Sequence, residues 1–196
     1  MIAYDAVVLA GGAARRLGGV DKPMTAVAGV PMLVGVLSAV SNARSIVVVG
    51  PRRELPQFGD RLSWTREDPP GGGPVAALAA GVAVLASPAP LVMVLAADLP
   101  FVHGAIGPLL DAAASSEADG AVLVDRGGHD QPLAAAYRRE PLLHRLATLG
   151  APGGAAVREL VGPMRLVRVR RDDAAFDCDT WDDIRHANER ATRRTR

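Results

Sequence analysis

Residues 7–23 read Val-Val-Leu-Ala-Gly-Gly-Ala-Ala-Arg-Arg-Leu-Gly-Gly-Val-Asp-Lys-Pro and are the most informative stretch of the chain. An apolar, β-branched run enters a loop of small residues that carries two adjacent arginines, a second glycine pair and a lysine. Glycines let the backbone approach a ligand closely, and successive amides in such a turn can surround an anion. Arginine and lysine add donors that suit phosphate oxygens. The pattern predicts a nucleoside triphosphate site at the carboxyl end of a first β-strand.

This loop differs from the two common phosphate-binding fingerprints. A P-loop requires Gly-x-x-x-x-Gly-Lys-Ser/Thr, whereas Lys22 is preceded by Asp21 and followed by Pro23. A dinucleotide-binding loop requires Gly-x-Gly-x-x-Gly at the start of a helix, whereas the glycines here are paired and the loop is long and basic. The alternative to a phosphate site is a glycine-rich surface loop with solvated arginines.

The composition favours one globular domain. The chain has 196 residues, of which 49% are hydrophobic and 4% aromatic, so Ala, Val and Leu must build most of the core. A net charge of +1 creates no overall field that would attract nucleic acid or a membrane surface. We therefore expect a single domain over residues 1–196, with a basic tail at about 188–196 as a solvated helix end, and neither nucleic acid nor a membrane as a partner.

The single cysteine, Cys178, excludes an intramolecular disulfide and a CxxC redox pair. The first residues do not show the basic stretch and apolar run of a signal peptide, and no 18-residue apolar run is present. These features fit a cytoplasmic protein.

Apolar strand-like runs alternate with helix-like runs. Strands are predicted at residues 6–9, 45–49, 62–65, 91–96, 121–124, 133–137 and 164–169. Helices are predicted at residues 32–40, 75–86, 106–114, 138–149 and 181–192. Continuous apolar strands separated by helices predict a Rossmann-like α/β fold with a mostly parallel sheet covered on both faces. Because such sheets bind ligands at the carboxyl ends of their strands, the loops after residues 9, 49, 65 and 96 should share one rim.

A second candidate segment is Arg-Glu-Asp-Pro-Pro-Gly-Gly-Gly-Pro-Val-Ala-Ala-Leu at residues 66–78. Its prolines and glycines exclude regular structure, and Pro74 can open the following helix. A rigid loop that exposes backbone amides and carbonyls can read the edge of a purine. The alternative is an ordinary surface loop in which Asp68 serves as a turn or cap residue.

Two acidic residues follow apolar segments. Asp98 ends the most apolar strand, where a carboxylate can hold Mg²⁺ together with substrate phosphates. The alternative for Asp98 is a cap for a helix that begins near His103. Asp179 or Thr180 should cap the last predicted helix.

Together these motifs resemble those of the molybdenum cofactor guanylyltransferases (MobA-like proteins) of the nucleotidyltransferase superfamily. The resemblance is carried by Leu-Ala-Gly-Gly-x-Ala-x-Arg-Leu-Gly at residues 9–18 with Lys22 four residues further on, by the loop at 66–78, and by Ala-Asp-x-Pro at 97–100. It extends from Val7 to about Ile184 and implies the fold of the nucleotide-diphospho-sugar transferases.

The resemblance also implies roles for particular residues. The implied nucleotide-binding residues are Leu9, Ala10, Gly11, Gly12, Lys22, Asp68, Gly73 and Asp98. The implied catalytic residues are Arg16, Lys22 and Asp98, and the implied Mg²⁺ ligands are Asp98 and Asp179. Capping of the last predicted helix alone is the equal alternative for Asp179.

The sequence departs from the family pattern in three places. Asparagine is common at the position of Asp179, and Trp181 replaces a usual proline. Gly50 stands where many relatives have a polar side chain, so one ribose or phosphate contact is expected to be missing. The turn at 130–133 fits the family on the side of the second substrate, with the neighbouring His129 expected to be solvated.

The implied reaction joins GTP to a molybdopterin-type cofactor and gives the guanine dinucleotide cofactor and pyrophosphate. Positioning and charge neutralisation carry such chemistry, and no nucleophilic side chain is required. Molybdoenzyme apoproteins or cofactor-insertion proteins are the expected protein partners. Three alternatives stay open: CTP with the same acceptor, transfer to a sugar or alcohol phosphate, and a non-catalytic GTP-binding module that delivers the cofactor.

Overall fold

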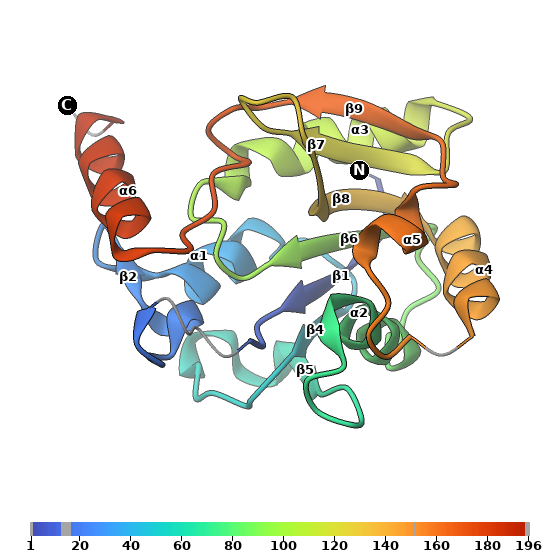
Figure 1. Ribbon diagram of the computed structural model, residues 1–196, viewed down its shortest axis with the longest axis horizontal. Coiled ribbons are helices and arrows are strands. Elements are labelled where there is room, and N and C mark those ends of the chain that lie inside the picture. Colours follow the sequence, from blue (N-terminus) through green and yellow to red (C-terminus); the bar gives the residue numbers. More distant parts are fainter. Residues whose placement is uncertain (1, 13–16, 151, 195–196) are drawn as a thin grey trace.

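The computed structural model describes residues 2–12, 17–150 and 152–194. Within these residues, seven strands form one sheet in the order β5-β4-β1-β6-β8-β7-β9 (Figure 1). The strands are β1 (Tyr4–Leu9), β4 (Ile46–Val49), β5 (Leu62–Thr65), β6 (Leu91–Ala96), β7 (Gly120–Val124), β8 (Asp130–Arg138) and β9 (Leu166–Arg170). β8 runs antiparallel to β6 and β7, and the other neighbours are parallel. The predicted α/β class with a mostly parallel sheet is confirmed.

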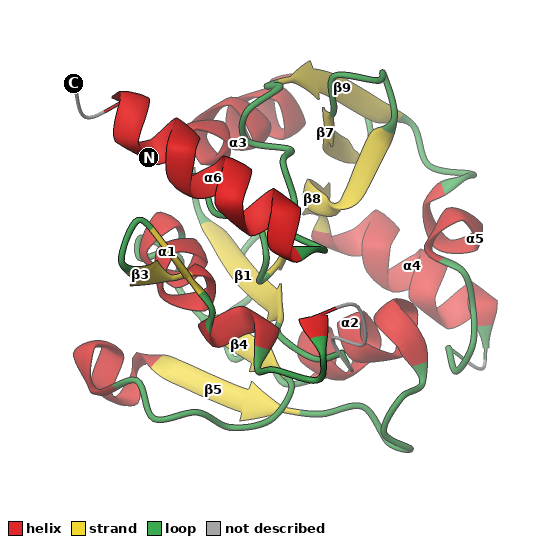
Figure 2. Ribbon diagram, turned by 60° about the vertical axis from the view of Figure 1, so that its left-hand side comes forward, coloured by secondary structure: helices red, strands yellow, loops and turns green. Residues whose placement is uncertain are grey.

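Helices cover both faces of this sheet (Figures 1 and 2). They are α1 (Met32–Ala39), α2 (Gly73–Ala83), α3 (Ile106–Ser115), α4 (Arg139–Leu149), α5 (Val157–Val161) and α6 (Trp181–Arg194). Alternation along β1 separates two cores, because Ala6 and Val8 pack with α1 and α3 while Val7 packs with α2. Among the helices that the structure describes, none is long and apolar enough to cross a lipid bilayer.

The elements that the sequence did not predict are short. They are the hairpin β2 (Ala26–Val27) and β3 (Val30–Pro31), the 3₁₀ turns η2 (Lys22–Met24), η3 (Pro56–Arg61) and η4 (Val102–Ala105), and α5. Such segments end before a helical or strand period can repeat. The predicted strand at 133–137 is longer in the structure, because polar residues from 130 onward pair with β7 beyond a bulge.

The predicted rim is confirmed by the register of the parallel strands. Leu9 lies opposite Val49 on one side and Ala96 on the other, and Val49 lies opposite Thr65. The loops that leave these four residues therefore begin at one edge of the sheet.

A buried ion pair lies at the opposite end of the sheet. Asp5 is fully buried in β1 and accepts a hydrogen bond from the Arg139 guanidinium, which also donates to the backbone oxygens of Ser87 and Ala89 at 2.8 and 2.7 Å. Burial raises the pKa of Asp5, and Arg139 offsets only part of that rise. The pair connects the start of α4 to the start of β1, away from the rim.

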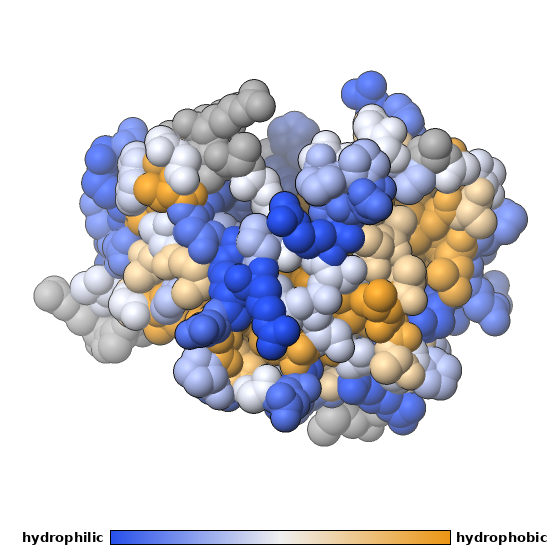
Figure 3. All heavy atoms as spheres, turned by 90° about the horizontal axis from the view of Figure 1, so that it is seen from below, coloured by the Kyte–Doolittle hydropathy of each residue, from blue (hydrophilic) through white to orange (hydrophobic). Residues whose placement is uncertain are grey.

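β5 forms one free edge of the sheet and is four residues long. Seen from the β5 side, hydrophilic side chains form a band across the middle of the surface (Figure 3). An edge strand of only four residues gives little opportunity for another strand to pair.

α6 lies apart from the sheet, beside β2 (Figures 1 and 2). Its apolar side contributes to a separate cluster, which consists of Leu17, Val27, Met32, Cys178, Ile184 and Ala187. The Ala28 amide also donates to Asn188 Oδ1 at 2.8 Å. The last helix therefore packs on the segment that directly follows the basic loop.

A capping box fixes the start of α6. Thr180 Oγ1 accepts a hydrogen bond from the Asp183 amide at 3.2 Å, and Asp183 Oδ2 accepts one from the Thr180 amide at 2.7 Å. Asp183 Oδ2 also accepts from the Asp179 amide at 3.1 Å. Burial disfavours the charged carboxylate, but these hydrogen bonds outweigh it and lower the pKa of Asp183. Thr180, one of the two predicted caps, fills this role, so the Asp179 side chain is not needed for it.

We predict opposite effects of one substitution at two helical glycines. A Cβ at Gly81 in α2 would lie 2.5 Å from a methyl carbon of Val7 and 2.8 Å from one of Val49, whereas a Cβ at Gly35 in α1 meets nothing within 4 Å. Gly81→Ala should lower the free energy of unfolding by about 1–3 kcal/mol through overpacking. Gly35→Ala should raise it by up to about 1 kcal/mol. Urea denaturation measures both, and a Gly81→Ala protein as stable as wild type would contradict this account of α2 packing.

We predict a pH-dependent contribution from the α6 cap. Asp183→Ala should cost about 1 kcal/mol at pH 7, whereas Asp182→Ala, which removes an exposed ion pair with Arg185, should cost much less. Because the pKa of Asp183 is lower in the folded state, its contribution is complete above the unfolded value of about 4 and is lost as the pH falls through the folded value. Denaturation between pH 2 and 7 tests this. A cost for Asp183→Ala that is independent of pH would be inconsistent with the cap.

Candidate active site

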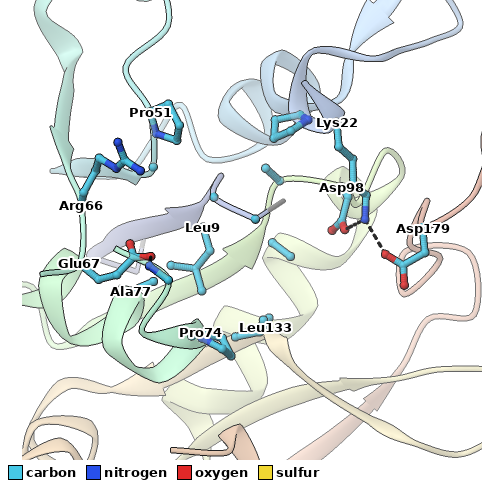
Figure 4. A pocket seen from close by; sticks show the side chains of 18 residues that line it. Leu9, Lys22, Pro51, Arg66, Glu67, Pro74, Ala77, Asp98, Leu133 and Asp179 are labelled. Carbon is cyan, nitrogen blue, oxygen red and sulfur yellow. Dashed lines mark hydrogen bonds and ion pairs between the residues drawn. The ribbon is translucent and has the colours of Figure 1, made fainter. Parts of the chain in front are cut away.

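A pocket of about 910 Å³ opens at the rim (Figure 4). Lys22, Asp98 and Asp179 lie at one end, and Arg66 and Glu67 lie at the other. Apolar side chains line the space between them, namely Leu9, Pro74, Ala77 and Leu133. The pocket therefore extends from the cluster of Lys22, Asp98 and Asp179, called the charged end below, to the proline- and glycine-rich loop that follows β5.

At the charged end, one ammonium group contacts two carboxylates. Lys22 Nζ lies 2.5 Å from Asp98 Oδ2 and 2.6 Å from Asp179 Oδ1. Burial alone would lower the pKa of Lys22, but the two carboxylates outweigh that effect and raise it. The ammonium is therefore charged at neutral pH, and the structure brings together three residues that the sequence selected as site residues.

Asp98 lies two residues after the end of β6. The Cys178 amide donates to the Asp98 backbone oxygen at 3.2 Å and joins the lead-in of α6 to the end of this strand. Asp98 Oδ1 is buried, and no hydrogen-bond partner for it exists among the described atoms. The nearby η4 begins at Val102 without a side-chain cap, so Asp98 does not serve as the helix cap that was the alternative for it.

The electrostatics of this end are dominated by carboxylates. Burial, together with the negative charges of Asp179 and Asp98, raises the pKa of Asp177. Burial also raises the pKa of the Cys178 thiol to about 12. The thiol therefore stays protonated and is a poor nucleophile.

The glycine pair of the basic loop faces the pocket. Gly11 and Gly12 line it, whereas Ala10 is fully buried beneath them and donates its amide to the Val49 oxygen at 2.8 Å. Gly50 has a φ of +149°, and a Cβ there would lie 2.8 Å from the Ala10 carbonyl carbon and oxygen. Close approach of the ends of β1 and β4 therefore explains the glycine at this position. Arg16 lies outside the described residues.

The loop after β5 contributes Gly73, which the sequence suggested, but Glu67 in place of Asp68. Gly73 and Pro74 line the pocket at the start of α2, but Asp68 is exposed and is not among the lining residues. Glu67 lines the pocket instead, and its Oε1 accepts a hydrogen bond from the Gly71 amide at 3.0 Å. Neighbouring acids in an irregular loop carry no periodicity, so the sequence offered no signal that would favour Glu67 over Asp68.

On the side of β8, Leu133 of the turn at 130–133 lines the pocket. The side chain of Asp125 orders this turn by accepting hydrogen bonds from the His129 amide and from Gln131 Nε2, each at 2.9 Å. The bond from the His129 amide is the main reason that the pKa of Asp125 is lowered. His129 is exposed, in agreement with its expected solvation.

Several proteins of known sequence resemble this chain. A molybdenum cofactor guanylyltransferase of Bradyrhizobium sp. (strain ORS 278) is 33% identical over 154 residues, which cover 74% of this chain and 73% of that protein. A second protein of the same name, from Burkholderia lata, is 29% identical over 190 residues, covering 91% of this chain and 92% of that protein.

Solved structures share the fold. Molybdopterin-guanine dinucleotide biosynthesis protein A from Archaeoglobus fulgidus matches with a TM-score of 0.73 at 20% identity, over 96% of this chain and 99% of that one. The 2-C-methyl-D-erythritol 4-phosphate cytidylyltransferase from Thermus thermophilus matches with a TM-score of 0.70 at 20% identity, over 98% of this chain and 100% of that one. The MobA-like NTP transferase domain family matches residues 6–169. The chain therefore belongs to the family of MobA-like NTP transferase domains and is a nucleotidyltransferase.

Proposed function

We propose that this enzyme transfers GMP from GTP to a molybdopterin-type cofactor. The observation that carries the proposal is the contact of the Lys22 ammonium with Asp98 and Asp179, in the same pocket as Gly11 and Gly12. The names of the Bradyrhizobium and Burkholderia relatives support the choice of nucleotide and acceptor.

In the proposed reaction, an oxygen of the acceptor's terminal phosphate forms a bond to the α-phosphorus of GTP. The bond from the α-phosphorus to the oxygen that bridges to the β-phosphate breaks, and pyrophosphate leaves with that electron pair. Such a displacement needs alignment and neutralisation of charge and does not need a protein nucleophile. The buried, protonated thiol of Cys178 agrees with a direct displacement.

The basic loop supplies the groups that bind the triphosphate. Gly11 and Gly12 present backbone amides to the phosphate oxygens, above the buried Ala10 and beside Leu9. Lys22 neutralises charge that develops between the α-phosphate and the leaving pyrophosphate. Arg16, which lies outside the described residues, belongs to the same loop and is proposed to add a second cation.

Asp98 and Asp179 are the residues proposed to hold Mg²⁺. Within the described residues, no group of three or more His, Cys, Asp or Glu side chains is arranged around a common metal position. Mg²⁺ needs no such group, because it usually binds one or two carboxylates and completes its shell with water and substrate phosphates. The buried, unpartnered Oδ1 of Asp98 fits this need. When bound, Mg²⁺ would supply neutralisation of the phosphate charge.

The loop at 66–74 is proposed to recognise guanine. Gly73 and Pro74 line the pocket at the start of α2, which leaves backbone amides and carbonyls of the loop to read the base. We also propose that Asp68, in the outer part of this loop, contacts the base or the ribose. Glu67 is the carboxylate that already faces the pocket.

We place this reaction in the cytoplasm and assign it to one domain over residues 1–196. The buried, unpaired thiol of the single cysteine fits a reducing compartment. The packing of α6 on Val27 and Met32 supports treating the last helix as part of the same domain. Molybdoenzyme apoproteins or cofactor-insertion proteins would receive the product.

We predict that GTP is the preferred nucleotide. At a concentration of about 100 times its Kd, GTP should stabilise the protein by about 2.7 kcal/mol, and CTP, ATP and UTP at the same concentration should stabilise it less. Thermal shifts with each nucleotide and Mg²⁺, followed by pyrophosphate release in the presence of the acceptor, measure the preference. Equal shifts for all four nucleotides would rule out guanine recognition, and release with CTP alone would identify a cytidylyltransferase.

We predict that Asp98→Asn separates the metal role from nucleotide binding. The substitution keeps the shape of the side chain but removes its charge, so turnover should fall about 10²–10³-fold and recover partly at high Mg²⁺. Binding of GTP without metal should stay the same or tighten, because a negative charge leaves the phosphate site. Asp111→Asn, on the exposed side of α3, is the matched control. Normal turnover of Asp98→Asn with normal Mg²⁺ dependence would leave Asp98 without a catalytic role.

A further inference from the structure

Arg53 makes an unusually complete set of contacts for a loop residue. Its Nε lies 3.1 and 2.8 Å from the two carboxylate oxygens of Asp21, and Nη2 lies 2.6 Å from the first of them. Nη1 donates to the Pro51 backbone oxygen at 3.1 Å, and Nη2 donates to the Ala10 backbone oxygen at 3.2 Å. The side chain is 10% exposed. The guanidinium is therefore held in one orientation, which is typical of a fork-shaped group with matched acceptors.

The partners of Arg53 lie at both ends of the basic loop. Ala10 directly precedes Gly11 and Gly12, and Asp21 directly precedes Lys22. One guanidinium thus connects Ala10, at the end of β1, to Asp21, directly before Lys22. The basic loop runs between these two residues. Through Pro51, it also fixes both points to the segment that follows β4.

The positive charge of Arg53 is paired with the carboxylate of Asp21. Asp21 accepts three of the five hydrogen bonds that Arg53 donates, and Arg53 is not among the residues that line the pocket. A paired guanidinium outside the pocket cannot provide the charge that the phosphates need. The contacts of Arg53 fix the positions of the two loop ends. These ends carry the Lys22 ammonium and the glycine amides, so the same contacts set the positions of those groups.

We propose that Arg53 is a positioning residue for nucleotidyl transfer, which clamps the two ends of the phosphate-binding loop so that Lys22 meets the α-phosphate in a fixed place. This inference rests on the proposed function. Because the loop is already ordered before the nucleotide binds, no free energy is spent on ordering the loop during the reaction. Lysine cannot replace arginine here, because a single ammonium lacks the planar fork that reaches Asp21, Pro51 and Ala10 together.

Adjacent arginines provide a matched experiment. Arg53→Ala and Arg53→Lys remove the fork, whereas Arg52→Ala removes an exposed arginine that precedes it directly in the chain. In the nucleotide-free protein, hydrogen exchange of the amides at 10–12 and 17–22 should become faster in both Arg53 variants and stay at the wild-type rate in Arg52→Ala. Unchanged exchange in Arg53→Ala would overturn the clamp, whatever reaction the enzyme catalyses.

Kinetics test the positioning role separately. For Arg53→Ala, kcat should fall about 10²-fold, with a smaller change in the KM for nucleotide, because Lys22 is displaced while the pocket stays intact. Added guanidinium ion should restore part of the lost rate. Faster exchange with normal kcat would overturn the positioning role. If wild type releases no pyrophosphate from any nucleotide, the proposed function fails and so does this role in it, while hydrogen exchange still decides whether Arg53 is a clamp.

A double-mutant cycle completes the test. If Asp21 acts through Arg53, Asp21→Ala should lower kcat about as much as Arg53→Ala, and the double variant should be no slower than either. Independent, multiplying losses would show that the two residues do not act as one contact and would overturn the proposal.

Discussion

The site depends on the contact between one ammonium group and two carboxylates. Lys22 Nζ lies within 2.6 Å of both Asp98 and Asp179, although Asp98 is 76 and Asp179 is 157 residues further along the sequence. Without a cation between them, these acids would stand close together in a partly buried place, where Asp177 already has a raised pKa. The sheet supplies Asp98 at the end of β6, and the capped start of α6 supplies Asp179. The architecture positions charges from three distant segments in one small volume.

The sheet was predictable because its strands are continuous apolar runs between helices. The runs at 62–65 and 91–96 coincide with β5 and β6. Because β5, β4, β1 and β6 are parallel, their carboxyl ends lie at one edge of the sheet and form the rim. Lys22, Asp98 and Asp179 were chosen from their motifs, and the structure brings them together. What these residues do there remains a proposal, because proximity establishes a site and not a reaction.

Other features depend on geometry that a sequence does not display. Arg52 and Arg53 are neighbours of the same type, and only the fold decides which of them faces Asp21 and Ala10. Glu67 rather than Asp68 faces the pocket for the same reason. Asp5 interrupts an apolar strand, and its partner Arg139 lies 134 residues away. The partners of Arg53 in the basic loop and the partner of Asp5 are distant in sequence, so no local pattern could identify them.

The position of α6 has a consequence for the synthesis of the chain. Lys22 and the glycine loop leave the ribosome before the strands that follow β1, and every strand of the described sheet precedes residue 171. Asp179 and the α6 residues that pack on Leu17, Val27 and Met32 follow after all of these strands. A growing chain can therefore complete its sheet while the ammonium of Lys22 still lacks one of its two carboxylates and the basic loop lacks its apolar support. The candidate site is therefore completed only after α6 has been made, which places its assembly after that of the sheet.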